Sequence, residues 1–175
     1  MKNISFRNDV LPLKNELFRL ALRITLDKAE AEDVVQETMI KVWNRRDTWD
    51  SIDSIDAFCM TVCRNMALDR VKAAERRLTL QNGEQAVAET KADRSYNANP
   101  AEQAEQRDRV ALVRRIIDSL PEKQRCVMQL RDIEGKSYKE IAAVLAISEE
   151  QVKVNIFRAR QTVKQRFIET DNYGL

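Results

Sequence analysis

The chain has 175 residues, of which 43% are hydrophobic and 33% charged, with only three glycines and three prolines. This composition favours helices, and the isolated glycines exclude a glycine-rich phosphate loop. Histidine is absent and the cysteines are Cys59, Cys63 and Cys126, which excludes histidine-based catalysis and the usual zinc sites, so neither cofactor nor metal is expected. No apolar run is long enough to span a membrane and no signal peptide is evident, so we expect a cytoplasmic chain whose cysteines are packing residues rather than redox centres.

The first third of the chain reads as helices. Apolar residues at three- and four-residue spacing, beginning at Leu13, predict a helix over residues 9–26. Asp27 and Glu30 suggest a capping box that starts a second helix, ending near Arg46. The stretch RDTWDSIDSI then predicts a loop.

A longer helix is predicted over residues 55–77, with Phe58, Val62 and Met66 on its core face and Cys59 and Cys63 beside them. From 79 to 99 the periodicity stops and the residues are mostly small or polar, which predicts a flexible linker. The sequence therefore predicts an all-α fold of two small helical domains, 1–80 and 101–175, joined by a flexible linker at 81–100.

The second domain contains two helix starts only eleven residues apart. After helices over 101–120 and from Pro121 to Gly135, Ser137 with Glu140 and Ser148 with Gln151 both form the capping-box pattern. A short helix, a three-residue turn and a longer helix are the layout of a helix-turn-helix.

The second helix of this pair is basic. Residues 109–175 carry 13 basic and 9 acidic side chains, and no acidic residue lies between Val152 and Ile168. A basic helix face is often only a solvated surface. Here it is the element that a helix-turn-helix inserts in the major groove, so the sequence predicts DNA binding.

The residues LPEKQRCVMQLRDIEGKSYKEIAAVLAISEEQVKVNIFRARQTVKQRF resemble region 4 of the extracytoplasmic-function (ECF) sigma factors, a subfamily of the sigma-70 family. AEDVVQETMIKVW resembles their region 2.2, and AFCMTVCRNMALDRVKAAERR resembles regions 2.3 and 2.4. The resemblance covers about four-fifths of the chain. It implies a bacterial transcription initiation subunit without catalytic chemistry of its own, which binds core RNA polymerase and reads the −10 and −35 promoter elements.

The resemblance also implies roles for single residues. Asp33, Gln36 and Glu37, on one helical face, would bind the beta-prime clamp helices of the polymerase; without the resemblance, such a polar face reads as merely solvated. The −10 element would be opened and read by Trp49, Asp50, Ser51, Arg64, Asn65, Arg70 and Lys72. For Trp49 two alternatives stand, stacking on a base or pinning the loop to the core, and the second is favoured.

In region 4, the start of the second helix would read the bases of the −35 element. Basic residues farther along the same helix would hold the DNA phosphates. The base-reading residues would be Ser148, Glu149, Glu150, Gln151, Lys153, Val154, Asn155 and Arg158, with Arg160 and Lys164 on phosphates. The family often has Thr at the position of Gln151, which leaves the base preference there open. Only Phe58 is aromatic within residues 57–70, which suggests weak melting and strict promoter choice.

The implied partners are core RNA polymerase, through its beta-prime clamp helices and beta flap, promoter DNA and an anti-sigma factor, with no stable homo-oligomer. Two other classes fit parts of the chain. A regulator joining the helix-turn-helix to a receiver or ligand domain predicts β-strands and a pocket in residues 1–80. A helical adaptor that binds only protein leaves the basic helix unexplained.

Overall fold

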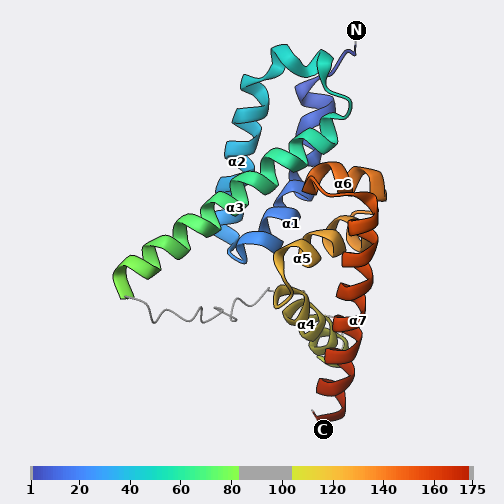
Figure 1. Ribbon diagram of the computed structural model, residues 1–175. Coiled ribbons are helices and arrows are strands. Elements are labelled where there is room, and N and C mark those ends of the chain that lie inside the picture. Colours follow the sequence, from blue (N-terminus) through green and yellow to red (C-terminus); the bar gives the residue numbers. More distant parts are fainter. Residues whose placement is uncertain (1, 83–103, 174–175) are drawn as a thin grey trace.

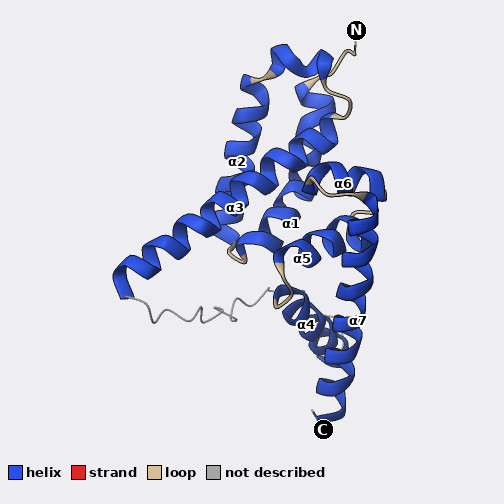
Figure 2. Ribbon diagram, in the orientation of Figure 1, coloured by secondary structure: helices blue, strands red, loops and turns tan. Residues whose placement is uncertain are grey.

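The structure, a computed structural model, describes residues 2–82 and 104–173. In this part of the chain the elements are all helical, with no β-strand (Figures 1 and 2). The first domain contains α1 (Lys14–Thr25), α2 (Lys28–Asn44) and α3 (Ile55–Asn82), and the second contains α4 (Ala104–Asp118), α5 (Glu122–Met128), α6 (Tyr138–Leu145) and α7 (Glu149–Tyr173). Four short turns of 3-10 or π-helix complete them: η1 (Phe6–Val10), η2 (Leu11–Leu13), η3 (Arg46–Ser51) and η5 (Gln129–Ile133). The predicted all-α fold is confirmed, while most of the predicted linker lies outside the described residues.

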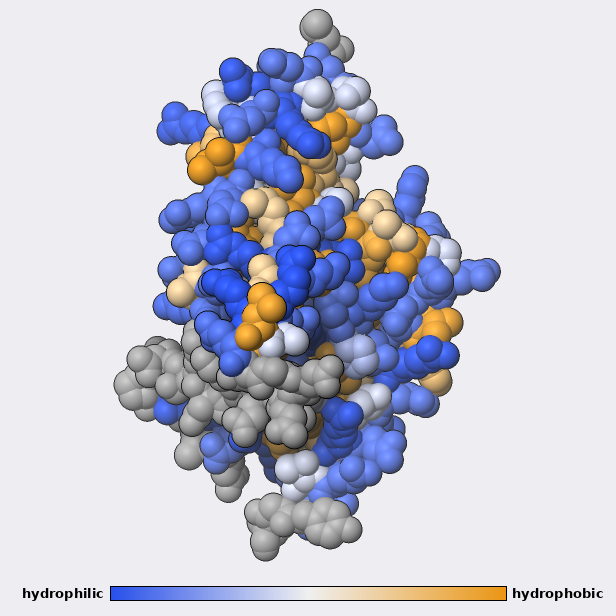
Figure 3. All heavy atoms as spheres, turned by 60° about the vertical axis from the view of Figure 1, so that its left-hand side comes forward, coloured by the Kyte–Doolittle hydropathy of each residue, from blue (hydrophilic) through white to orange (hydrophobic). Residues whose placement is uncertain are grey.

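None of the helices in the described ranges is long and apolar enough to cross a bilayer. On the face shown in Figure 3 the described surface is mainly hydrophilic, with apolar side chains in small groups. Such a distribution is ordinary for a protein surface, so single exposed apolar residues matter only where they extend a functional face.

Local capping signals set several helix boundaries. The Ser137 hydroxyl accepts from the Glu140 amide at 3.1 Å, and the Glu140 carboxylate accepts from the Ser137 amide at 2.7 Å, so the predicted capping box of α6 is complete. Asp27 caps α2 by accepting from the amides of Ala29 and Glu30. The second half of the predicted Asp27–Glu30 capping box is wrong, because the Glu30 carboxylate accepts a hydrogen bond from Arg70 of α3 instead.

The first domain is a three-helix core. Leu17 and Leu20 of α1, Val34 and Val42 of α2 and Met60 of α3 are fully or almost fully buried where the helices meet. Cys59 and Cys63 are 0% exposed, and burial raises the pKa of both thiols to about 12. Both cysteines therefore pack as small apolar side chains, as expected.

The corner of the helix-turn-helix depends on one left-handed residue. Ala146 ends α6 with a φ of 54°, and its amide donates to the Ala142 carbonyl oxygen. The turn then brings Val152 and Ile156 of α7 against Ile141 and Leu145 of α6, all of them buried. This apolar wedge fixes α7 relative to α6, with the opposite face of α7 directed to solvent.

The two domains pack against each other. α3 crosses the molecule against α6, and α1 contacts α5 and η5 (Figure 1). One continuous buried cluster includes Leu17 and Met60 from the first domain and Leu130 and Ile141 from the second. The cavity at this junction measures only about 10 Å³, so the packing is close.

Ion pairs between described residues border this junction. They join the first domain to the second and are Arg19–Glu134 at 2.5 Å, Arg23–Asp118 at 2.7 Å, Arg64–Glu122 at 3.1 Å and Glu16–Lys136 at 3.2 Å. Burial raises the pKa of Asp118, and the nearby guanidinium of Arg23 opposes this shift. The predicted flexible linker leaves the placement of the two domains open, and the residues that pack them together lie on the helices and η5.

Candidate nucleic-acid interface

The N-terminal turn of α7 begins at a complete capping box. The Ser148 hydroxyl accepts from the Gln151 amide, and Gln151 Oε1 accepts from the Ser148 amide, both at 3.1 Å. Glu149, Glu150 and Gln151 are all exposed. Since only the oxygen of the Gln151 side chain serves the cap, its amide NH₂ is a donor pair that the cap does not use. The structure thus keeps the predicted −35 residues of this turn accessible.

The outward face of α7 is more apolar than expected. Val154 is 45% exposed and Phe157, one turn later, is 61% exposed. We did not single out Phe157 from the sequence, although its position three residues after Val154 places both on one face. Exposed apolar side chains on a helix in the major groove suit the thymine methyl group.

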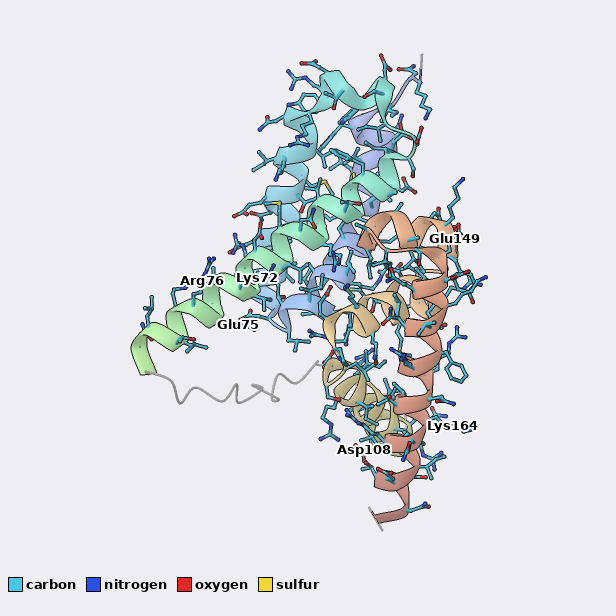
Figure 4. All side chains as sticks on the ribbon, viewed as in Figure 1. Lys72, Glu75, Arg76, Asp108, Glu149 and Lys164 are labelled. Atoms are coloured by element: carbon cyan, nitrogen blue, oxygen red, sulfur yellow. The ribbon has the colours of Figure 1, made fainter. Side chains whose placement is uncertain are left out.

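Basic side chains line a hollow beside α7. Its volume is about 360 Å³, and its lining includes Lys153, Phe157, Arg160 and Lys164. The Lys153 ammonium lies 5.8 Å from the centre of the Tyr138 ring, which also has Arg131 over it at 4.7 Å. Glu149 and Lys164 mark two points along α7 (Figure 4), and the cations that line the hollow all belong to this helix.

Three other predicted α7 residues differ in whether their side chains already have partners within the chain. Arg158 is exposed, whereas the Asn155 amide nitrogen donates to the Gln151 carbonyl oxygen at 2.8 Å. Arg160 Nη2 lies 2.5 Å from Asp132 Oδ1 of η5, and that hydrogen bond raises the pKa of the guanidinium. Arg160 therefore braces α7 against η5, which leaves Lys164 as the less constrained of the two phosphate candidates.

The predicted −10 loop is partly a 3-10 helix. Trp49 is 6% exposed and its indole N–H donates to the Val42 carbonyl oxygen at 3.2 Å. Trp49 thus pins η3 to the core, and its assignment as a DNA contact does not fit this position. Asp50 and Ser51 are exposed beside it.

The predicted −10 residues of α3 fall into two groups. Asn65 and Lys72 are exposed, and Lys72 lies on the outer part of α3 with Glu75 and Arg76 (Figure 4). Arg64 is 8% exposed, and its guanidinium makes two hydrogen bonds of 3.1 Å to the Glu122 carboxylate of α5. We expect a −10 contact to be accessible to DNA, but α5 covers the Arg64 side chain in this packing of the two domains.

The predicted polymerase-binding residues share the exposed face of α2. Asp33, Gln36 and Glu37 are all exposed, as expected. Arg70, assigned from the sequence to the −10 element, lies instead against this face, with its Nη1 3.6 Å from Asp33 Oδ2 and its Nη2 bonded to Glu37. The sequence did not indicate this pairing, which depends on how α3 packs on α2.

Two apolar residues extend the same face. Ile40 is 60% exposed and Trp43 is 45% exposed, at positions seven and ten residues after Asp33. Trp43 packs edge-on against Phe6 with ring centres 5.3 Å apart, and Arg46 lies over its ring at 4.7 Å. The sequence contains a signal for both residues, because Ile40 is seven residues after Asp33 and Trp43 is three residues after Ile40, as on one side of a helix.

Comparison with known proteins identifies relatives of both domains. Residues 10–77 match the Sigma-70 region 2 family and residues 111–163 match the Sigma-70, region 4 family. The ECF RNA polymerase sigma factor SigL of Mycobacterium tuberculosis is 32% identical over 149 residues, which are 85% of this chain and 80% of SigL. The probable RNA polymerase sigma factor RfaY of Xanthomonas campestris pv. campestris is 30% identical over 161 residues, or 91% of this chain, which spans only 40% of RfaY.

A solved structure shares the fold. The sigma factor RpoE of Bartonella quintana, in complex with the anti-sigma factor NepR, superposes with a TM-score of 0.78 at 21% identity, over 95% of this chain and 98% of RpoE. Two sigma-70 regions in their usual order cover more than half of the chain, and SigL matches it over most of both lengths. The chain belongs to the sigma-70 family, in its ECF subfamily of RNA polymerase sigma factors.

Proposed function

We propose that this chain directs core RNA polymerase to promoters and carries out no reaction of its own. The observation that carries the proposal is the exposed face of α7, which begins at a complete helix cap and combines polar, apolar and basic side chains on the second helix of a helix-turn-helix. Such a helix reads base edges with its first turns and holds phosphates with later basic residues.

The recognition of the −35 element is assigned to α7. Glu150, Gln151, Val154 and Phe157 face outward near its start and are placed to meet base edges. Arg158 is exposed one turn beyond Val154 and keeps its assignment to a base edge, and Lys164 supplies positive charge farther along the helix, placed to hold a phosphate.

The first domain is assigned two tasks. The α2 face containing Asp33, Gln36 and Glu37, with Ile40 and Trp43 beyond it, would bind core RNA polymerase. Asp50, Ser51, Asn65 and Lys72 are exposed and are the residues assigned to the −10 element. Arg64 would join them only after α5 moves away.

An anti-sigma factor is a further expected partner. The solved structure of RpoE, which shares this fold, is a complex with the anti-sigma factor NepR, and that of CnrH is a complex with the cytosolic domain of CnrY. We assign this chain a protein inhibitor of the same kind, whose identity the fold does not specify.

The test is binding to core RNA polymerase. The full-length chain should co-purify with core enzyme, and replacing Asp33, Gln36 and Glu37 together by alanine should abolish this while circular dichroism stays helical, because all three side chains are exposed. Replacing Lys123, an exposed residue of α5, is the control and should leave binding intact. A folded triple variant that still binds core enzyme would refute the assignment of this face.

A further inference from the structure

Arg70 lies where three carboxylates of α2 meet one guanidinium. Its Nη1 is 2.7 Å from Glu30 Oε2 and 3.6 Å from Asp33 Oδ2, and its Nη2 donates to Glu37 Oε1. The three acidic residues are spaced i, i+3 and i+7, so they share one side of α2. Because Arg70 comes from α3, these contacts tie the acidic side of α2 to the neighbouring helix.

The charges explain why one arginine suits this place. Three carboxylates within two turns repel each other, and like charges at this spacing destabilise a helix. The planar guanidinium presents its donors as a fork and can bond several carboxylates at once, which an ammonium does less well. The hydrogen bond to Glu30 is the main cause that raises the pKa of Arg70, so Arg70 stays ionised.

The exposures show which groups a partner meets first. The side chain of Arg70 is 28% exposed, compared with 61% for Asp33 and 47% for Glu37. The carboxylates thus face outward while the guanidinium lies beside and beneath them. A partner docking on this face touches the carboxylates, and DNA phosphates approaching Arg70 meet negative charge.

We infer that Arg70 is a positioning residue of the polymerase-binding face, where it holds Asp33 and Glu37 in place for a positively charged surface of core RNA polymerase. Arg70 is then not a −10 DNA contact. This inference rests on the polymerase-binding role proposed above for α2.

The first measurement is the affinity of the full-length chain for core RNA polymerase. Arg70→Ala should weaken binding to core RNA polymerase about tenfold, because Asp33 and Glu37 lose the charged contacts that hold them in place for the partner. Arg70→Lys keeps the charge without the fork and should recover part of the affinity. Arg76→Ala removes the same charge from an exposed position on the same helix and should leave the affinity unchanged.

A double-mutant comparison then shows whether Arg70 acts through the carboxylates. In a chain carrying Glu30→Gln, Asp33→Asn and Glu37→Gln, adding Arg70→Ala should cause no further loss of affinity. Promoter opening by holoenzyme assembled with saturating Arg70→Ala chain should equal that of wild type. Should Arg70→Ala fail to fold, the same measurements on Arg70→Lys decide.

The outcomes separate this inference from the role proposed for α2. If the triple carboxylate variant retains full affinity, the α2 face itself is wrongly assigned. If that variant loses affinity and Arg70→Ala does not, only the positioning role is overturned. Normal core affinity combined with poor promoter opening would make Arg70 a DNA contact.

Discussion

Glu140 sets the start of α6 and gives that start a pH dependence. Its carboxylate accepts the Ser137 amide, and this hydrogen bond is the main cause that lowers its pKa below the ordinary value of 4.5. A carboxylate whose folded-state pKa is lowered stabilises the fold above its unfolded pKa. That stabilisation is lost as the pH falls through the folded value.

We therefore expect Glu140→Gln to reduce the acid sensitivity of folding. The amide oxygen of glutamine can still accept the Ser137 amide, but it does not titrate, so the difference in stability between wild type and variant should shrink as the pH falls below the ordinary glutamate pKa of 4.5 and through the lowered folded-state value. Thermal unfolding at a series of pH values measures this difference. A pH-independent difference would show that the cap does not depend on the ionised carboxylate.

Sequence patterns predict such residues when their partners are local. The Ser137–Glu140 and Ser148–Gln151 boxes, each spanning only three residues, are confirmed, whereas the equally local Glu30 bonds Arg70 of α3 instead of closing the box with Asp27. Arg64 and Arg70 are different, since their carboxylate partners are 58 and 40 residues away in the chain. Nothing in the local pattern indicates that α5 covers the first or that α2 holds the second.

Among the elements, α7 combines base-reading and phosphate-holding positions on a single helix. Its first turns present Gln151, Val154 and Phe157, and Lys164 follows about two turns after Phe157. Lys164 also lines the basic hollow beside the helix. The two groups should therefore respond differently to salt and to promoter sequence.

Replacing Lys164 by alanine should weaken binding to all promoters alike. One lost phosphate contact reduces the slope of log affinity against log salt by about 1, because fewer counterions are released. The measurement is promoter binding by reconstituted holoenzyme over a salt series, with Lys123→Ala as the control for a charge removed outside α7. A change in sequence preference with an unchanged salt slope would place Lys164 on a base instead.

The boundaries of the elements were predictable where periodicity and caps agree. Helix α6 starts directly after Ser137 and α7 directly after Ser148, as the two predicted capping boxes require. The predicted helix over 9–26 is instead divided, with Pro12 in the 3-10 turn η2 before α1 begins at Lys14. The polar stretch after α2 forms the 3-10 helix η3 because Trp49 anchors it to the core, a contact that composition does not indicate.

For the whole molecule, the packing of the two domains decides which residues are accessible. Arg64 can meet DNA only if α5 separates from α3, since Glu122 holds its guanidinium and only 10% of its side chain is exposed. The packed arrangement thus keeps one predicted DNA contact covered. The surfaces of the first domain that pack against the second lie on α1 and α3. From the sequence alone, the apolar residues of these two helices are assigned to the core of the first domain, so the pattern does not predict the contact between domains.

Glu122→Ala should open this arrangement. The change leaves the nearly buried charge of Arg64 without that carboxylate, which costs the closed form on the order of 1–3 kcal/mol. Small-angle scattering of the free chain should show a larger radius of gyration for Glu122→Ala than for wild type.

Glu75→Ala is the matched control, because it removes an acidic side chain from the outer part of α3 (Figure 4). That variant should scatter like wild type. Equal radii for all three proteins would mean that the Arg64–Glu122 pair does not hold the domains together.

The central claim is that this chain gives core RNA polymerase its promoter choice, with α7 reading the −35 element. The most direct measurement is transcription by core enzyme from a library randomised at both promoter elements, with no sigma factor, with the wild-type chain and with Gln151→Ala. Wild type should select one pair of elements that core enzyme alone does not select, and Gln151→Ala should change the preference at −35 while the −10 preference stays the same. No selection by the wild-type chain, or a Gln151→Ala effect confined to −10, would contradict the account.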